Sequence, residues 1–349
     1  MKKFASLFVA AVLMLVGLPT AEAKTYNIRF TTNLFEKHPL VANGFKPWFA
    51  DVQKNTGDQV KIKFFNPNTI CPEKDIAASV INGSLDMGSN TPNRNVNEFP
   101  LHSVFNLALL ANSAVGEGLL AKRVADEFPR FRKEYDKMHF LGYWGGGVMN
   151  VMTCNKQVKT LEDLKGLRII CFDKELGDIA TALGANPVFV GFPDAYMALA
   201  RHQADGILAA PLACPSGKFG EHLKYVTLLG LQSDCRWTGM NQKLWNKLPA
   251  DIQKVFDTMS DNEDFTRRIS QSLDDGDKAG REYLIKCGVE FYTPDKEEIA
   301  RWEARLLPMR EKWVDRMVEG GFASREEAMA ILKRTIEISN EIKASESAK

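Results

Sequence analysis

Apolar and polar positions between residues 160 and 211 fall into three strand-like runs separated by two helix-like stripes. The runs at 167–172, 188–190 and 207–210 are apolar and partly β-branched, as strands covered on both faces are. The first stripe ends at Gly184, and the second begins with Pro193 in its first turn. Strands joined by helices pair in parallel, so we expect a sheet whose ligands bind beyond the carboxyl ends of its strands.

The N-terminal part repeats this order. Its pattern predicts, in order, an alternating strand at 25–31, a helix with an apolar stripe at 41–52, a strand at 60–65, a helix at 72–81 and a strand at 85–88. Further strands are expected at 138–143 and 148–154, on either side of the glycines at 145–147. Two units of one design in 349 residues predict two α/β domains.

The C-terminal part is predicted to be helical. The helical pattern runs from 251 to 285 with hardly a break apart from Gly276 and Gly280, and amphipathic helices follow at 295–319 and 324–345. Residues 346–349 are expected to be a disordered tail. One apolar stripe is expected to pack on the second domain: Trp302, Leu306, Trp313 and Met317.

The first 23 residues have the pattern of a secretory signal peptide. Lys2 and Lys3 precede an apolar run at 4–18, and Ala21-Glu22-Ala23 is a small-x-small cleavage site. The apolar run is shorter than the roughly 20 residues that span a bilayer. The sequence therefore predicts an exported, periplasmic protein.

Charge argues against a nucleic-acid partner. The chain has 45 Lys and Arg and 44 Asp and Glu, of which the predicted leader holds two and one, so the remainder carries no net charge. Nucleic acids and anionic membranes both select basic surfaces. We expect neither as a partner.

Six cysteines permit disulfides in an exported chain, but their spacing allows many pairings. Cys154 with Cys171 is the pair we favour, and the alternative is that several cysteines are buried as small apolar residues. No CxxC motif or Cys/His spacing indicates zinc, and the five histidines are scattered. We expect no metal and no cofactor.

A hydrolase is the enzyme alternative. Ser216 or Cys214 could serve as a nucleophile with His222 as its base, but the chain has no G-x-S-x-G elbow around them. We therefore expect the protein not to be an enzyme.

Several strings resemble one family. The chain is similar to the solute receptors of tripartite ATP-independent periplasmic (TRAP) transporters, the DctP-type family. The similar strings are LEDLKGLRI, ALGANPV and ALARHQADG in the central stretch, NGSLDMGS at 82–89, NKQVKTLEDLKGL at 155–167 and NQKLWNKLPADIQKVF at 241–256. The resemblance spans nearly the whole mature chain. It implies an α/β, two-lobed periplasmic binding protein with a long helix spanning both lobes. Lobe I would be 24–147 with 236–275, and lobe II would be 148–235 with 276–345.

The resemblance also implies where a ligand binds. Family members commonly hold a ligand carboxylate with an arginine at the position of Ile170, and a second arginine of the sialic-acid branch corresponds to Asn150. An asparagine that is common after the third strand corresponds to Ala209 or its neighbour. Arg168 shares a strand face with Ile170 and stays a candidate. Phe192 matches the aromatic residue that lines the family's pocket.

Without the usual arginine, the predicted site is rich in aromatic and apolar residues. Phe192, Trp144, Met149 and Trp237 indicate a small organic acid with a sizeable apolar or aromatic part, such as an indole-like acid. A buried carboxylate needs donors, since leaving it unpaired costs several kcal/mol. The candidate donors are backbone N–H groups and three side chains: Arg94, Lys174 and Arg236. A sulfonate, a dicarboxylate or an uncharged solute is the alternative ligand.

The resemblance implies partners as well. A TRAP receptor closes over its solute and delivers it to a membrane permease of a small and a large subunit, driven by an ion gradient. The same fold can instead present its ligand to a membrane receptor kinase, and the sequence leaves both open. We expect a monomer.

Overall fold

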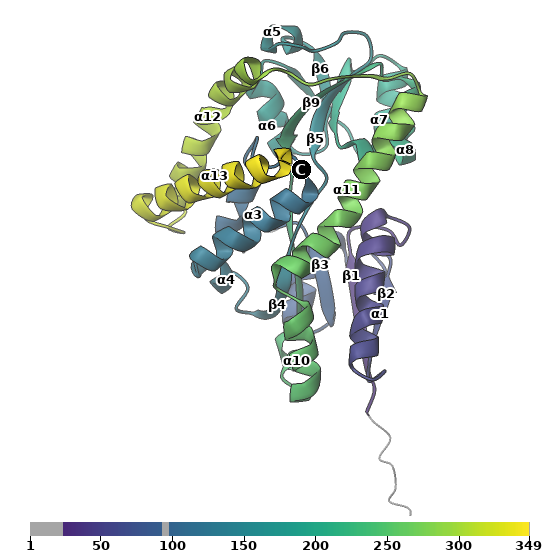
Figure 1. Ribbon diagram of the computed structural model, residues 1–349, viewed down its shortest axis with the longest axis vertical. Helices are drawn as coiled ribbons and strands as arrows, with labels where there is room; N and C mark the ends of the chain where they lie inside the picture. Colours follow the sequence, from purple (N-terminus) through teal and green to yellow (C-terminus); the bar gives the residue numbers. More distant parts are fainter. Residues whose placement is uncertain (1–23, 93–97, 349) are drawn as a thin grey trace, which may run out of the picture.

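The computed structural model describes residues 24–92 and 98–348 and shows two lobes, each built around one β-sheet (Figure 1). The predicted α/β, two-lobed fold is therefore confirmed. The predicted leader, residues 1–23, lies outside the described residues.

Five strands form the sheet of lobe I, in the order β2 (Val60–Phe65), β1 (Tyr26–Thr32), β3 (Met87–Asn90), β10 (Cys235–Asn241) and β4 (Met138–Gly145). The first three run parallel, as the helices between them require. β10 pairs antiparallel with both β3 and β4. The carboxyl ends of β1 and β3 therefore share one edge of the sheet.

Six strands form the sheet of lobe II, in the order β11 (Glu290–Tyr292), β9 (Tyr225–Gln232), β5 (Met149–Thr153), β8 (Gly206–Ala209), β6 (Arg168–Cys171) and β7 (Asn186–Phe189). β6 runs parallel to β7 and β8, which confirms the strand–helix order read from residues 160–211. β5 runs antiparallel to β8 and β9.

Helices cover both faces of each sheet. Those of lobe I are η1 (Leu40–Phe45, a π-helix), α1 (Lys46–Asn55), η2 (Glu73–Asp75), α2 (Ile76–Asn82), η4 (Leu101–Asn106), α3 (Ala114–Glu127), α4 (Arg130–Lys133), α9 (Gln242–Trp245) and α10 (Ala250–Met259). Those of lobe II are α5 (Leu161–Leu164), α6 (Lys174–Ala182), α7 (Phe192–Ala200), η5 (Pro211–Ala213), α8 (Cys214–Gly217) and η6 (Phe219–Glu221). Three long helices remain: α11 (Glu263–Lys286), α12 (Lys296–Glu319) and α13 (Arg325–Ser347).

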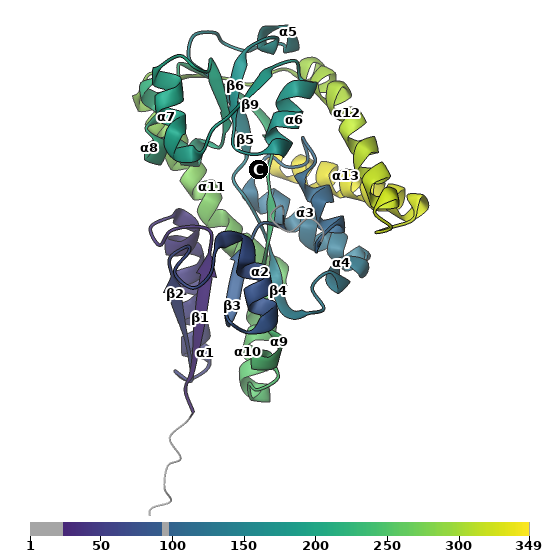
Figure 2. The same cartoon turned by 180° about the vertical axis from the view of Figure 1, so that it is seen from behind.

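The lobes are joined by two strand crossings and by two long helices, α11 and α12. The chain leaves β4 for β5 through residues 146–148 and returns from β9 to β10 through residues 233–234. α11 contacts α3, η1 and β4 of lobe I and η5 and α8 of lobe II, so it spans both lobes as predicted (Figure 2).

The predicted helix over 251–285 is in fact two helices. Asp261 adopts a left-handed conformation with φ of 47°, and Asn262 then caps α11 by accepting the N–H of Phe265 at 2.8 Å. An asparagine side chain that bonds the backbone in this way ends one helix and begins another. The apolar spacing continues through the break, which is why the pattern did not reveal it.

The assignment of residues 276–345 to lobe II is wrong for the C-terminal helix. Trp302 and Leu306 pack in lobe II as expected, but Trp313 and Met317 of the same helix lie in the core of lobe I. α13 packs against α3 of lobe I, and its buried face belongs to that core (Figure 1). The prediction of a disordered tail at 346–349 is also wrong for residues 346 and 347, because α13 continues to Ser347; Lys349 lies outside the described residues.

All six cysteines are free, so the expected Cys154–Cys171 disulfide is absent. The two residues lie on opposite faces of the lobe II sheet, in different apolar clusters. β8 separates their strands, and β5 and β6 run in opposite directions, so the carboxyl ends of the two strands lie at opposite edges. Burial raises the pKa of Cys154 to about 11 and that of Cys171 to about 12.

Candidate ligand-binding cleft

Two adjoining hollows lie between the lobes. One has a volume of about 550 Å³ and the other about 120 Å³, and they share Met149, Phe172, Asp234 and Arg236. Residues just beyond the ends of β1, β3, β6 and β8 line them, as the parallel-strand pattern predicted. We call these two hollows together the cleft.

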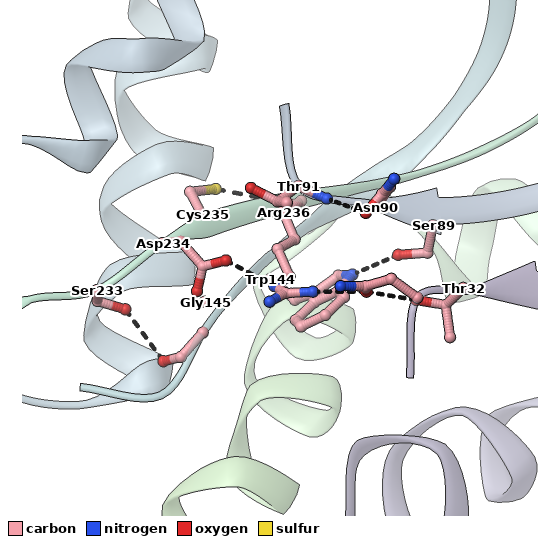
Figure 3. A network of polar contacts seen from close by, with 12 residues as sticks. Thr32, Ser89, Asn90, Thr91, Trp144, Gly145, Ser233, Asp234, Cys235 and Arg236 are labelled. Carbon is pink, nitrogen blue, oxygen red and sulfur yellow. Dashed lines mark hydrogen bonds and ion pairs between the residues drawn. The ribbon is translucent and has the colours of Figure 1, made fainter. Parts of the chain in front are cut away.

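Arg236 lies at the centre of the cleft. It is the second residue of β10, and its Nε is 2.8 Å from Asp234 Oδ2, while Nη1 donates to Asn33 Oδ1 at 2.8 Å (Figure 3). Its side chain is 15% exposed, which leaves one edge of the guanidinium accessible. No partner of Nη2 is found in the described part of the chain. The two contacts fix the side chain and leave this amino group for a ligand.

The indole ring of Trp144 packs against the guanidinium of Arg236. The guanidinium carbon is 5.2 Å from the indole centroid, a cation–π distance (Figure 3). The indole is fully buried, and its Nε1 donates to Ser89 Oγ at 3.0 Å and Thr238 Oγ1 at 3.2 Å. Trp144 thus acts on a ligand through Arg236.

The lobe II wall of the cleft is apolar. Phe172, which follows β6, and Met149, which begins β5, line both hollows, and Ala209 at the end of β8 lines the smaller one. Phe192 lines neither hollow: it is 39% exposed, and its ring lies 5.8 Å from that of Phe172. Phe172 is therefore the aromatic residue of lobe II that faces the cleft, and Phe192 contacts the ring of Phe172.

The far end of the larger hollow is charged. Lys174 lines it but is largely exposed and pairs with Asp178 at 2.6 Å. Arg316 of α12 lies at the same end, and its Nη2 donates to Ser103 Oγ at 2.8 Å. Burial and the negative charge of Asp173 raise the pKa of Glu175 to about 7. This end offers cationic groups and a carboxyl that titrates near neutral pH.

Arg168 and Ile170 do not line the cleft. The two residues share a face of β6 with Phe172, as strand alternation predicts, but only Phe172 is at the carboxyl end. Arg168 lies at the opposite end, where its Nη2 is 2.8 Å from Asp205. Ile170 is fully buried in the core of lobe II between them.

The side chain of Asn150 makes its hydrogen bonds within the sheet of lobe II. Its Oδ1 accepts the N–H groups of Leu229 at 2.9 Å and Gly230 at 3.2 Å, and its Nδ2 donates to the Val148 carbonyl at 3.1 Å. The register of β5 and β9 shifts at this point. The carboxamide therefore holds an irregular strand pair.

Trp237 faces away from the cleft. It neighbours Arg236 on β10, so its side chain points to the other face of the sheet. There it is buried beside Phe99 and Tyr135, with ring centroids 5.9 and 6.4 Å away. Arg94 lies outside the described residues.

The sequence interpretation did not assign His38, Phe172, Asp234 or Arg316 to the site. His38 lines the smaller hollow and Asp234 both. His38 and Phe172 follow strands whose carboxyl ends were expected to face the ligand, so a systematic use of that rule would have found them. Arg316 carries no such signal, because only the packing of α12 brings it to the cleft.

Within residues 24–92 and 98–348, no group of three or more His, Cys, Asp and Glu side chains is arranged to hold a metal ion. Over the same ranges, no helix has both the length and the apolar character that crossing a bilayer requires.

Comparison with known proteins identifies the family. Residues 30–316 match the model of DctP, the bacterial extracellular solute-binding proteins of family 7. The chain belongs to this family. Its members are solute-binding receptors, as the TRAP-like strings predicted.

Two curated relatives of this family 7 protein carry ligand names. It is 27% identical over 183 residues to the C4-dicarboxylate-binding periplasmic protein DctP of Rhodobacter capsulatus, which covers 51% of this chain and 53% of that protein. It is 25% identical over 262 residues to the 2,3-diketo-L-gulonate-binding periplasmic protein YiaO of Escherichia coli K12, which covers 72% and 78%. The first match thus spans about half of that relative.

Solved structures of TRAP solute-binding proteins share the fold. The protein from Rhodoferax ferrireducens T118, with copurified benzoate, has a TM-score of 0.79 and 21% identity, and covers 93% of this chain and 100% of its own. The protein from Bordetella bronchiseptica, with bound (R)- and (S)-mandelate, has a TM-score of 0.75 and 22% identity, and covers 89% and 99%. At these identities the likeness establishes the two-lobed fold.

Proposed function

We propose that this chain is the extracytoplasmic receptor of a TRAP transporter and binds a small organic acid with an apolar or aromatic part in the cleft. It would deliver this acid to the small and large subunits of the membrane permease. Family membership supports the receptor role, and the composition of the cleft supports the ligand class. The ligand-binding residues of this proposal are Arg236, Phe172, Met149 and Ala209, with Trp144 in contact with Arg236 and Phe192 in contact with Phe172.

One observation carries the proposal: a largely buried guanidinium faces an apolar wall. A planar guanidinium suits a carboxylate, and the free Nη2 of Arg236 can donate to it in a site of low water content. The opposite wall, with Phe172 and Met149, offers aromatic and thioether surface to an apolar group. The cleft thus has one end for the anion and one wall for the rest of the molecule.

The known ligands of relatives are compatible with this division. Benzoate and mandelate occupy proteins of the same fold, and both combine one carboxylate with one ring. The two curated relatives are likewise named for acids, C4-dicarboxylate and 2,3-diketo-L-gulonate, and these acids differ from benzoate and mandelate in the rest of the molecule. The apolar wall of this cleft supports the aromatic class.

Binding would shift the lobes toward a closed form. The larger hollow is lined by both lobes, so a ligand bound to Arg236 of lobe I faces the wall of lobe II. Movement of lobe II toward the ligand would add contacts with that wall and so favour a closed form. The crossings at 146–148 and 233–234 are the natural hinges. The closed form would be the one that docks on the permease.

Isothermal titration calorimetry tests the ligand class. We expect benzoate, mandelate or indoleacetate to bind the wild type, and Arg236→Gln to raise the Kd at least about tenfold through loss of a charge-assisted hydrogen bond. Arg168→Gln is the matched control and should leave the Kd unchanged, because that arginine pairs with Asp205 away from the cleft. Tight binding of succinate or malate, with no aromatic acid bound, would contradict the proposal.

A dicarboxylate receptor is the second candidate. The name of the Rhodobacter capsulatus relative favours it, and Arg316 could receive a second carboxylate at the far end of the larger hollow. The same titrations separate the two, because Arg316→Gln should weaken succinate binding and leave benzoate binding unchanged.

A hydrolase receives no support from the structure. Burial raises the pKa of the Cys214 thiol to about 12, so a thiolate nucleophile would be disfavoured there. Ser216 Oγ donates to the Ala213 carbonyl at 3.0 Å, and His222 packs against the ring of Tyr196 at 4.7 Å.

A further inference from the structure

His38 stands on the lobe I wall of the smaller hollow, together with Trp144 and Arg236. It ends the loop after β1, and the π-helix η1 begins two residues later at Leu40. π-helical turns are rare and often occur at functional sites. The next residue, Pro39, lies against α11 at van der Waals distance from the Cβ position of Gly276, so the loop is anchored. The half-buried imidazole thus has a defined position at the cleft.

One hydrogen bond determines which ring nitrogen carries the proton. The backbone N–H of Leu40 points to His38 Nδ1 at 3.3 Å. An amide N–H can only donate, so Nδ1 must be the acceptor, and a neutral imidazole then carries its hydrogen on Nε2. Within the described residues, Nε2 has no hydrogen-bond partner. It is the donor that remains for a ligand.

The surroundings favour the neutral ring. Burial and the positive charge of Arg236 lower the pKa of His38 to about 4. Protonation would also put a hydrogen on Nδ1 and break the bond from Leu40. Among the described residues that line the same hollow, Asp234 and Arg236 are the charged ones, and they pair with each other at 2.8 Å. On its own loop, Glu36 pairs with Lys46 at 2.5 Å.

We propose that His38 is a ligand-binding residue whose neutral Nε2–H donates a hydrogen bond to the anionic group that Arg236 also receives. The inference rests on the proposed function and deepens it. The carboxylate is then held by two donors of lobe I, a guanidinium and an imidazole, instead of by the lobe II position occupied here by Ile170. Lobe II contributes the apolar wall that closes over the rest of the ligand.

Two substitutions separate the proposed role from a structural one. In His38→Asn, the side-chain oxygen can still accept the Leu40 N–H, but no donor reaches the position of Nε2. In His38→Gln, the longer amide can place an N–H near that position. We expect His38→Asn to raise the Kd for benzoate about tenfold or more, and His38→Gln to stay within about threefold of the wild type. Thermal unfolding of each variant controls for folding.

The protonation state can be read without any ligand. A two-dimensional ¹⁵N–¹H spectrum of the imidazoles, with His38 assigned by its loss in His38→Asn, should show an unprotonated Nδ1 and a protonated Nε2 from pH 5.5 to 8. For the same reason, His38 should contribute no pH dependence to benzoate affinity over that range, whereas the carboxyl of Glu175 in the larger hollow, with its pKa raised to about 7, changes its charge there. An Nδ1–H tautomer, or a ring that is charged at pH 6.5, would overturn the inference.

The outcomes distinguish this inference from the function beneath it. If Arg236→Gln abolishes benzoate binding while His38→Asn binds as the wild type does, only the His38 inference fails. An equal loss in both His38 variants while they stay folded would also overturn it, since ring shape rather than Nε2–H would then matter. If no acid of the panel binds the wild type, the proposed function fails and the His38 role fails with it.

Discussion

Glu117, on the first turn of α3, is buried without a hydrogen-bond partner for either carboxyl oxygen among the described residues. Burial, with a further contribution from the charge of Asp234, raises its pKa well above the ordinary value. The folded protein therefore prefers the protonated form. This contribution to stability is complete below the ordinary pKa of the group and is lost as the pH rises toward the raised one.

Glu117→Gln should remove this pH dependence. We expect the free energy of unfolding of the wild type, relative to that of the variant, to fall as the pH rises above the ordinary glutamate pKa, by at most about 1.4 kcal/mol per pH unit. Urea unfolding at several pH values measures it. Glu127→Gln, on the same helix, is the control: ion pairing with Arg334 lowers the pKa of Glu127, so its removal should not flatten the slope. Parallel curves for the wild type and Glu117→Gln would show that Glu117 is ionised when folded.

Single residues also show how far the sequence could go in predicting the site. Of the residues that the sequence proposed for ligand binding, Trp144, Lys174, Ala209 and Arg236 line the cleft, and their contact with a ligand stays a prediction. Arg168 does not, because strand alternation gives the face of a side chain and says nothing about which end of the strand meets the ligand. Trp237 was misplaced for a related reason: its neighbour Arg236 takes the face that borders the cleft.

At the level of elements, α11 depends on two glycines with different surroundings. A Cβ on Gly280 would lie 2.1 Å from the Pro211 carbonyl oxygen, so this glycine lets α11 touch the backbone of η5. A Cβ on Gly276 would meet the ring of Pro39 at 3.4 Å, which is ordinary contact. The same helix thus provides a test and its control.

Gly280→Ala should destabilise the protein by about 1–3 kcal/mol, because backbone has to move to admit the methyl group. Gly276→Ala should be neutral or stabilising by up to about 1 kcal/mol, since alanine is the better helix former. Thermal and urea unfolding of the two variants measure the difference. If Gly280→Ala were as stable as Gly276→Ala, the close packing of α11 on η5 would be wrong.

The elements themselves were largely predictable, and the exceptions have physical causes. The strand–helix order, the cap at Gly184 and the two C-terminal helices follow from local periodicity and turn residues. The break at 260–262 was missed because it depends on one asparagine cap within a continuous apolar pattern. Periodicity reports that a face is buried, and it does not report what covers it, so the lobe against which α13 packs was also missed.

At the scale of the molecule, the two lobes share more than the hinge strands. α12 places Trp302 in lobe II and Trp313 in lobe I, and α13 then adds its apolar face to lobe I. In the proposed closure, lobe II would therefore move against a lobe I that includes α13. The cleft lies where the carboxyl ends of parallel strands from both sheets face each other, which is the arrangement expected of a clamp for a small solute.

A crystal structure of the wild type with an aromatic acid from the calorimetric panel tests the central claim most directly. The account predicts that the carboxylate lies within hydrogen-bond distance of Arg236, that the ring lies against Phe172 and Met149, and that the lobes are closer than here. An acid whose carboxylate is held by lobe II, or one bound outside the cleft, would contradict it.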